Sequence, residues 1–246
     1  MISTLLAIDI FNRQLDGGEM RTPAKVTRET DYFRSRIGSV ETPDDLISDF
    51  RLYRYVMTAF DLADAAPQKA LVKRVLSEDP SAEGSTAARL ADAKFRELSE
   101  AFGFGVAGNL KLKLPDFLSE VESRYTRVSA ELSIGETSNG ARLAAYFDRK
   151  IPDAGSWYEI LADKPMREVV FTALQMPDAM QTLDVDRLAQ ELERRFAFEF
   201  FQDAEKREEF IRRFAIFSDM NNLSTSTPGA GALSLLTAAS RANLLL

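Results

Sequence analysis

Apolar residues recur along most of this chain at the spacing of an α-helix. Phe50, Tyr53, Met57 and Phe60 are separated by three, four and three positions, a spacing that lines side chains along one buried face of a helix. Residues 86–102 follow a similar pattern and predict one long helix. The pattern as a whole predicts an all-α protein.

One stretch of the pattern occurs twice. Residues 32–62 return without a gap as residues 146–176, so that Tyr32 pairs with Tyr146 and Asp49 with Asp163. The apolar positions keep their phase throughout both copies. We interpret this as an internal duplication, and we predict a multi-helix bundle built from two pseudo-repeated helical halves, with flexible termini.

The repeated aspartates are predicted to cap helices. Asp49 and Asp163 each precede an apolar helical stretch, where a carboxylate can accept hydrogen bonds from the free N–H groups of the first turn. Thr42 followed by Pro43 marks the start of a short helix in the same way. The hydroxyls of Tyr32 and Tyr146 are each expected to make one hydrogen bond.

Breaks in the helical pattern divide the chain into five parts. We expect an N-terminal helix and arm at 1–27, a first helical half at 28–103, a linker at 104–114, a second helical half at 115–220 and a flexible C-terminal tail at 221–246. Within the linker, leucine alternates with lysine from 110 to 114, so a short strand is an alternative there.

Composition narrows the possible functions. The chain has 246 residues and a net charge of -7, with acidic and basic residues intermixed, which argues against binding to the phosphates of nucleic acid. It contains no cysteine and no histidine. Disulfides, thiolate nucleophiles, Ser-His-Asp triads and imidazole metal ligands are therefore excluded, and we expect no cofactor.

The sequence also bears on location. No apolar run approaches the 18 or so residues of a membrane-spanning helix, and the N-terminal stretch carries an acidic residue, Asp9, where the apolar core of a signal peptide is uncharged. We therefore expect no membrane insertion. The expected location is the cytoplasm, or a site that the protein reaches by a route without a cleaved signal peptide.

A glycine-rich segment matches the letters of a nucleotide-binding motif. Gly103, Gly105 and Gly108 give the pattern GxGxxG, which cradles a pyrophosphate when it follows a strand and begins a helix. Here a predicted helix precedes the motif, and no pattern of parallel strands surrounds it. We interpret the glycines as a helix stop.

Two pairs of carboxylates are the candidates for chemistry. Asp45 and Asp49 lie four residues apart, and Glu159 and Asp163 repeat that spacing in the second copy. The pairs could chelate a metal or act in catalysis, although carboxylate-bridged metal sites in helical bundles add histidines that this chain lacks. Helix capping and an ion pair with Arg36 or Lys150 are the structural alternatives.

The C-terminal segment has a different composition from the rest. After Asn221 it is rich in serine, threonine, glycine and alanine, and Arg241 is its one charged residue. Its leucines could dock into the groove of a partner protein, or the segment could remain disordered or fold back on its own domain. The candidate partner-binding residues are Leu233, Leu235, Leu236 and Leu244.

Several runs of sequence together resemble a known family. They are RETDYF at 28–33, DDLISDFRLYRYVMTAF at 44–60, RLADAKFRELSEAFGF at 89–104, LAAYFDRK and ILAD between 143 and 163, and FQDAEKREEFIRRF at 201–214. In this order they resemble an alphaproteobacterial family, the domain of unknown function numbered 1217, over about residues 20–220. The resemblance implies an all-helical protein encoded among flagellar genes, and it carries over no catalytic residues.

These observations lead to a functional expectation. We expect a non-enzymatic protein that acts in bacterial flagellar assembly or structure through contacts with partner proteins. The alternative is a small-ligand binder or enzyme that uses the carboxylates of Asp45, Asp49, Glu159 and Asp163.

Overall fold

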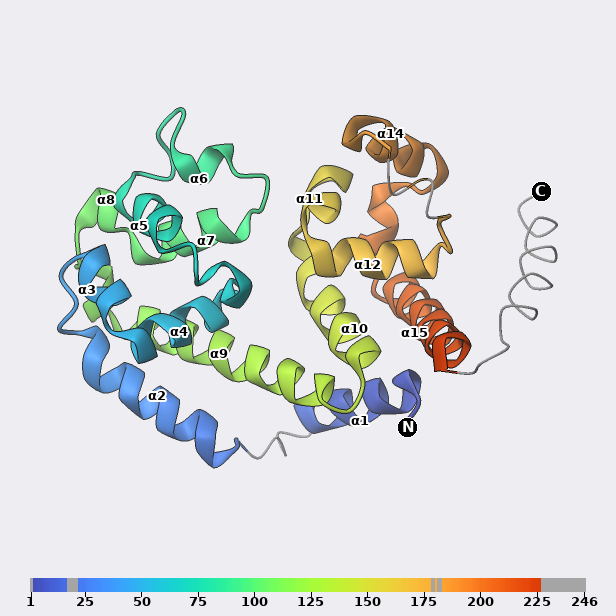
Figure 1. Cartoon of the computed structure of the whole chain (residues 1–246), viewed down its shortest axis with the longest axis horizontal. Helices are drawn as coiled ribbons and strands as arrows, with labels where there is room; N and C mark the ends of the chain where they lie inside the picture. Colours follow the sequence, from blue (N-terminus) through green and yellow to red (C-terminus); the bar gives the residue numbers. More distant parts are fainter. Residues whose placement is uncertain (1, 17–21, 178–179, 181–182, 227–246) are drawn as a thin grey trace. The chain divides into compact units, whose positions relative to one another are not determined.

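The computed structural model describes residues 2–16, 22–177, 180 and 183–226 (Figure 1). Every regular element within these residues is a helix, which confirms the prediction of an all-α protein. None of these helices combines the length and the apolar character that a bilayer span requires.

The chain forms two compact units. Unit 2 consists of residues 14–133, whereas unit 1 combines residues 1–13 with residues 134–246. The predicted halves met at a linker at 104–114, so the observed division lies further along the chain. Unit 1 is discontinuous in sequence, because its first helix is separated from the remainder by the whole of unit 2.

Unit 2 contains helices of different lengths around one apolar core. In chain order they are α2 (Ala24–Ile37), α3 (Pro43–Ser48), α4 (Phe50–Ala59), η1 (Ala63–Ala65), α5 (Lys69–Ser77), α6 (Thr86–Arg89), α7 (Lys94–Phe102), α8 (Phe104–Ala107), η2 (Lys111–Lys113) and α9 (Pro115–Gly135), whose last residues belong to unit 1. Helix α4 packs against α2 and α3, and α5 packs against α3 and α7. The rings of Phe33, Tyr55 and Tyr125 stack in the core, with centroids 4.7 and 3.8 Å apart.

Unit 1 has a comparable set of helices. They are α1 (Thr4–Asp16), which ends just beyond the unit boundary, α10 (Asn139–Lys150), η3 (Ile151–Asp153), α11 (Trp157–Ala162), α12 (Lys164–Ala173), α14 (Val185–Arg195), η4 (Phe198–Gln202) and α15 (Ala204–Ser226). Helix α12 packs against α10, α11 and α15, and α11 also packs against α14 (Figure 1). Phe147, Trp157 and Phe201 are buried in this core.

Helix α1 is fixed to the last helix of the same unit. The hydroxyl of Thr4 donates to Oδ1 of Asp219 at 2.6 Å, and the Thr4 backbone N–H donates to the same carboxylate. Gly140 on α10 permits this approach, because a Cβ atom there would lie 2.7 Å from the Thr4 hydroxyl. The apolar side chains of Ala7 and Phe11 on α1 are buried.

Several elements of the two units have matching bounds. Helices α11 and α12 each begin and end 114 positions after α3 and α4, with 43 matching 157 and 59 matching 173. Both α4 and α12 are followed closely by a non-glycine residue with positive φ, Asp61 at 58° and Gln175 at 51°. The next N–H in each copy, of Leu62 and Met176, bonds to the carbonyl five residues back, as in a Schellman-type helix end.

The prediction of one long helix at 86–102 is wrong. The chain forms α6 and α7 there, with Leu90 in an extended conformation at φ -77° and ψ 132°. The carboxylate of Asp92 accepts a hydrogen bond from the Lys94 N–H at 3.0 Å. The apolar spacing continues across this break, which is why the sequence pattern did not reveal it.

Residues 104–114, expected to be a linker, are packed into unit 2. Leu112 is buried, and the ring of Phe104 stacks on Phe102 with centroids 5.8 Å apart. The alternative of a strand at 110–114 is wrong, because this stretch forms the 3-10 helix η2. The carbonyl of Lys111 accepts the N–H of Leu114, so the alternation of leucine and lysine here follows a tight helical turn.

Candidate functional site

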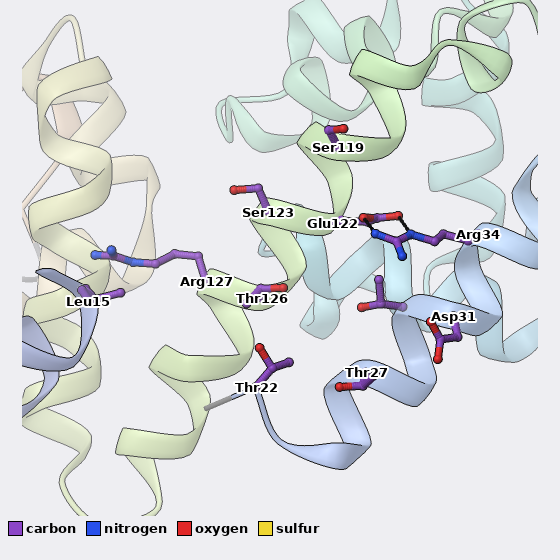
Figure 2. A pocket seen from close by; sticks show the side chains of 11 residues that line it. Leu15, Thr22, Thr27, Asp31, Arg34, Ser119, Glu122, Ser123, Thr126 and Arg127 are labelled. Atoms are coloured by element: carbon purple, nitrogen blue, oxygen red, sulfur yellow. Dashed lines mark hydrogen bonds and ion pairs between the residues drawn. The ribbon is translucent and has the colours of Figure 1, made fainter. Parts of the chain in front are cut away.

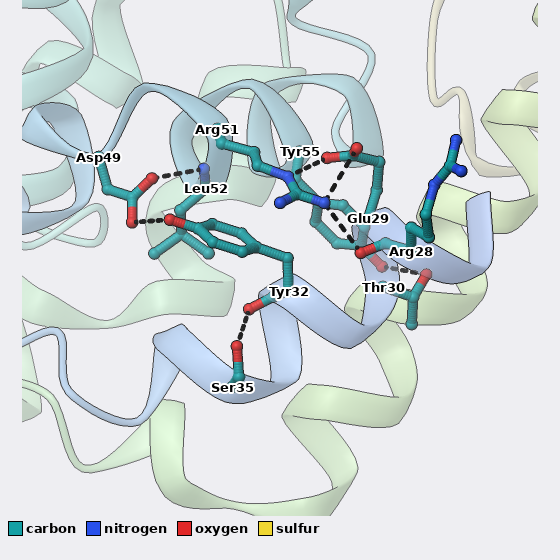
Figure 3. A network of polar contacts seen from close by, with 9 residues as sticks. All are labelled: Arg28, Glu29, Thr30, Tyr32, Ser35, Asp49, Arg51, Leu52 and Tyr55. Atoms are coloured by element: carbon teal, nitrogen blue, oxygen red, sulfur yellow. Dashed lines mark hydrogen bonds and ion pairs between the residues drawn. The ribbon is translucent and has the colours of Figure 1, made fainter. Parts of the chain in front are cut away.

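Asp49 is the centre of a polar network in unit 2 (Figure 3). It lies between α3 and α4, and its Oδ1 atom accepts the Leu52 N–H at 3.0 Å, the bond of an N-cap. Its Oδ2 atom accepts the hydroxyl of Tyr32 at 2.8 Å and Nε–H of Arg36 at 3.4 Å. The carboxylate therefore joins the first turn of α4 to the side of α2.

Arg51 extends this network along α2 (Figure 3). Its guanidinium lies 4.1 Å from the centroid of the Tyr32 ring and donates through Nε to Glu29 at 2.8 Å. A further bond joins it to the carbonyl of Arg28 at 3.1 Å. These contacts cross from α4 to α2, so the network fixes the packing of the two helices.

The same arrangement occurs in unit 1. Asp163 lies between α11 and α12, where Oδ1 accepts the Met166 N–H at 3.0 Å and Oδ2 accepts the hydroxyl of Tyr146 at 2.6 Å. Here the aspartate is only 8% exposed. The predicted caps at Asp49 and Asp163 and the predicted hydrogen bonds of the two tyrosine hydroxyls are thus confirmed.

Asp45 and Glu159, the other members of the two carboxylate pairs, accept hydrogen bonds from backbone and hydroxyl groups near their own helix starts. Oδ2 of Asp45 accepts the N–H of Thr42 and its hydroxyl, both at 2.9 Å, and completes a capping box. Oε2 of Glu159 accepts the Gly155 N–H at 2.9 Å. Among the residues that the structure describes, no cluster of three or more acidic side chains is arranged to hold a metal ion.

Hydrogen bonding shifts the pKa values of this network. Burial alone would raise the pKa of Asp49, but the bonds from Leu52, Tyr32 and Arg36 together outweigh it and hold the pKa below its usual value. The hydroxyl of Thr42 and backbone N–H groups lower the pKa of Asp45. The bond to Asp49 raises the pKa of Tyr32.

Unit 2 is expected to lose stability as the pH falls below about 4. Because the folded pKa values of Asp45 and Asp49 are depressed, their stabilisation is fully present above the ordinary carboxyl pKa and is lost as the pH drops through the folded value. Urea denaturation followed by circular dichroism at pH 6 and pH 3 measures this loss. An Asp45→Asn variant should lose less than the natural chain between the two pH values, and an equal loss would contradict the assignment.

A groove of about 640 Å³ lies between α2 and α9 in unit 2 (Figure 2). Arg34 and Glu122 face each other across it and form two parallel hydrogen bonds, each of 2.5 Å. Most of its other lining residues carry hydroxyl groups, and Leu15 is the apolar one among them. The hydroxyl-bearing residues are Thr22, Thr27, Thr30, Ser119, Ser123 and Thr126.

The groove is anchored to the core beneath it. The hydroxyl of Thr30 lies 3.2 Å from that of Tyr55, and burial raises the pKa of Tyr55. Binding sites for small molecules are mostly apolar with a few polar groups, whereas this lining is polar nearly throughout. It therefore has the character of a solvated surface. Sequence reasoning missed it, although Ser119, Ser123 and Thr126 share one helix face.

The glycine motif serves the packing of α8. Gly103 ends α7 with φ 65°, a conformation that favours glycine. A Cβ atom on Gly105 would lie 2.3 Å from the backbone of Glu78, so this glycine permits α8 to approach the end of α5. Helix α7 directly precedes the motif, which is not the setting of a phosphate-binding loop.

The predicted partner-binding leucines, Leu233, Leu235, Leu236 and Leu244, lie outside the described residues. The described end of the chain nevertheless exposes apolar side chains. On α15, Ile216 is 49% exposed, Met220 39% and Leu223 65%. The helix also continues to Ser226, beyond the expected start of the tail at 221.

Comparisons with known proteins place the chain in a family. Among curated proteins, none matches it. Over 90% of its length the chain is similar to a crystal structure of a protein from Agrobacterium tumefaciens, with 31% identity, a TM-score of 0.79 and 97% of that chain covered. Residues 59–206 match the family described as protein of unknown function (DUF1217). This chain therefore belongs to the DUF1217 family.

Proposed function

We propose that this chain serves bacterial flagellar assembly or structure, without catalysing a reaction, by binding partner proteins. The cellular context comes from the resemblance of its sequence runs to a family encoded among flagellar genes. Proteins are favoured over nucleic acid as partners because the net charge is -7. On this proposal the protein works in the cytoplasm or at the flagellum.

The use of the four candidate carboxylates supports this proposal over a ligand-binding or catalytic one. Each of them accepts a hydrogen bond from a backbone N–H of its own copy: Asp45 from Thr42, Asp49 from Leu52, Glu159 from Gly155 and Asp163 from Met166. These bonds satisfy N–H groups at or just before the first turn of a helix, which have no partner within the helix. Each of the four carboxylates therefore has a local role at the start of a helix, and Asp49 also pairs with Arg36.

The observation that carries the proposal is the apolar end of α15. Ile216, Met220 and Leu223 are exposed there, and further leucines follow in the sequence at 233, 235, 236 and 244. Exposed apolar side chains grouped on one surface are typical of protein interaction sites. The C-terminal end of the chain is thus the best-supported partner-binding region.

Swimming in soft agar tests both parts of this proposal. A strain that lacks the gene is expected to swim poorly, and the full-length chain should restore swimming. A chain with Leu233→Ser, Leu236→Ser and Leu244→Ser should fail to restore it, because the leucines are proposed to bind the partner. The matched control changes the intervening polar residues, Ser234→Ala and Thr237→Ala, and should restore swimming.

The two parts fail in different ways. Normal swimming by the deletion strain would rule out the flagellar role. If the deletion strain is defective but the leucine variant restores swimming as well as the control does, the flagellar role stands and the binding role of these leucines fails. Immunoblotting for equal amounts of each variant guards against loss by degradation.

We also infer that the two halves arose by internal duplication. The matching bounds of α3 with α11 and of α4 with α12, the repeated aspartate caps and the repeated positive φ support it. Since each Tyr–Asp pair spans 17 residues, the duplicated part includes its capping contact as well as its apolar face. If either aspartate could be replaced by alanine without lowering the free energy of unfolding, the repeated capping contact would have no role in stability.

A further inference from the structure

A pocket of about 270 Å³ lies within unit 1, between α1, α10 and α15 (Figure 1). Its larger apolar lining residues are Leu5 and Ile8 from α1 and Ile211 from α15, and its polar ones are Asp9, Asn12, Asp148, Arg207, Glu208 and Arg212. Apolar walls combined with a few polar groups are typical of sites for small molecules. The volume lies just below the range of about 300–1,000 Å³ for drug-sized ligands, so the pocket suits a smaller molecule.

The pocket is the counterpart of the hydroxyl-lined groove in unit 2 (Figure 2). Each of its lining residues on α10 lies 114 positions after one that lines the groove from α2, and each on α15 lies 85 positions after one that lines it from α9. The ion pair of the groove recurs with exchanged charges, because Arg34 and Glu122 correspond to Asp148 and Arg207. The same position is therefore hollow in both units.

The two hollows differ in their lining. Thr30 and Thr126 of the groove correspond to Ala144 and Ile211 of the pocket, and both of the latter are buried. Helix α1 adds a further apolar side chain, that of Leu5. The pocket in unit 1 can therefore hold an aliphatic group, for which the polar groove in unit 2 offers no matching surface.

Arg207 is held in place by the protein and keeps hydrogen-bonding capacity. Its Nη1 donates to the carbonyls of Phe201 and Gln202 at 2.9 and 3.2 Å. Its Nε lies 3.7 Å from Oδ1 of Asp148, which is an ion pair too long for a hydrogen bond. Within the described residues, neither Nε nor Nη2 makes a hydrogen bond. A guanidinium that is fixed in this way is suited to bind a carboxylate.

Carboxylates lie close to this guanidinium. Asp148 forms the ion pair with it, and Asp9 on α1 lines the same pocket. Asp9 has no hydrogen bond or ion pair with any residue that the structure describes. The pocket is lined by three carboxylates and two guanidiniums in total. This balance disfavours a phosphate or another purely anionic ligand and leaves a place for a positive group.

We propose that this pocket binds a free α-amino acid with an aliphatic side chain. The carboxylate of the ligand accepts hydrogen bonds from Arg207, and its ammonium group faces Asp148 and Asp9. A zwitterion fits because its two charges are joined through one carbon atom, as Arg207 and Asp148 are close neighbours. The aliphatic side chain packs against the apolar residues of α1 and α15.

Binding at this position also affects α1. Because α1 forms one wall of the pocket, the bound amino acid joins the N-terminal helix to α10 and α15. A ligand that binds only the folded protein raises its stability by mass action, so thermal unfolding of unit 1, followed by Trp157 fluorescence, should shift to higher temperature. The proposal does not depend on the flagellar role.

Isothermal titration calorimetry of the full-length chain with L-leucine tests the proposal. One leucine is expected to bind per chain. Leucinamide lacks the carboxylate and N-acetyl-leucine lacks the ammonium group, so each should bind about tenfold or more weakly, which is the effect of losing a hydrogen bond to a charged group. No binding of L-leucine in the millimolar range would overturn the proposal, as would equal binding of all three compounds.

Variants locate the binding in the pocket. Arg207→Gln should weaken the binding of L-leucine about tenfold or more. Asp9→Asn changes an exposed residue and preserves folding, and it should weaken binding about two- to fivefold, as expected for a solvated ion pair. The matched control is Glu209→Gln, which removes a charge next to the pocket but outside its lining and should leave binding unchanged.

The variants must bind leucine as folded proteins, which the fluorescence of Trp157 verifies for unit 1. If Arg207→Gln is not folded, the comparison of Asp9→Asn with Glu209→Gln decides. Leucine binding that is equal in these two variants would place the ligand elsewhere and contradict the proposal. The swimming test does not bear on any of these results, so the two proposals fail separately.

Discussion

Replacing Phe147 with alanine is expected to lower the free energy of unfolding of unit 1 by about 3–5 kcal/mol. The side chain is fully buried, and its ring lies 5.7 Å from that of Phe201 and 5.6 Å from that of Phe210. Truncation removes these contacts and leaves a cavity that close-packed neighbours on η4 and α15 fill only in part. The loss is a large fraction of the total stability of a typical domain.

The single tryptophan makes this loss measurable in one unit. Trp157 belongs to unit 1, is buried, and lies 5.5 Å from the Phe201 ring. Its fluorescence therefore reports the unfolding of unit 1, whereas circular dichroism reports the helices of both units. Urea denaturation of the Phe147→Ala variant should shift the fluorescence midpoint to lower urea.

The control for this substitution is Phe33→Ala in unit 2. Phe33 occupies the corresponding position of the first copy and is also fully buried. Its loss should destabilise unit 2 and be evident in circular dichroism. An unchanged fluorescence midpoint for Phe147→Ala would contradict the assignment of Phe147 to the core of unit 1.

Replacing Asp163 with alanine is expected to cost more than the same change at Asp49. Both substitutions remove an N-cap, which costs about 1 kcal/mol. At Asp163 the change also leaves the Tyr146 hydroxyl without its 2.6 Å acceptor in a buried setting, which adds about 1–3 kcal/mol. At Asp49 the side chain is 16% exposed, and water can replace it more readily.

An asparagine at position 163 tests the contribution of the N-cap separately from that of the negative charge. An Asp163→Asn variant keeps a good N-capping group and a partner for the Tyr146 hydroxyl, so it should retain most of the stability that Asp163→Ala loses. Thermal denaturation followed by Trp157 fluorescence compares the two variants at position 163, and circular dichroism measures Asp49→Ala. The prediction fails if Asp163→Ala and Asp49→Ala lose equal stability and Asp163→Asn is no more stable than Asp163→Ala. Burial of the cap at Asp163 would then make no difference to the free energy of unfolding.

The features that depend on near neighbours in sequence were predictable. The caps at Thr42, Asp49 and Asp163 follow from residues within one helical turn of each other. A hydrogen bond from each of the two tyrosine hydroxyls was also predictable, but the partners, Asp49 and Asp163, lie 17 residues away and required the structure. The sequence could not reveal the break between α6 and α7, since the apolar spacing runs through it and the cap at Asp92 is weak evidence alone.

Features that depend on distant residues were not predictable. The hydroxyl-lined groove forms because α2 and α9, far apart in sequence, both pack near Tyr55. The division into units was missed for the same reason, because no local pattern indicates that α1 bonds to α15. The structure was also required to show that α15 exposes apolar side chains on the side away from the core.

The attachment of α1 to α15 sets an order for folding during synthesis. Thr4 and its partner Asp219 are 215 residues apart, and at about 5–20 residues per second the ribosome takes about 10–40 s to cover that distance. Unit 2 is continuous in sequence and is complete on the nascent chain well before α15 is made. Until α15 has been made, the backbone N–H and the hydroxyl of Thr4 lack the carboxylate of Asp219, so this attachment of α1 is completed only near the end of synthesis.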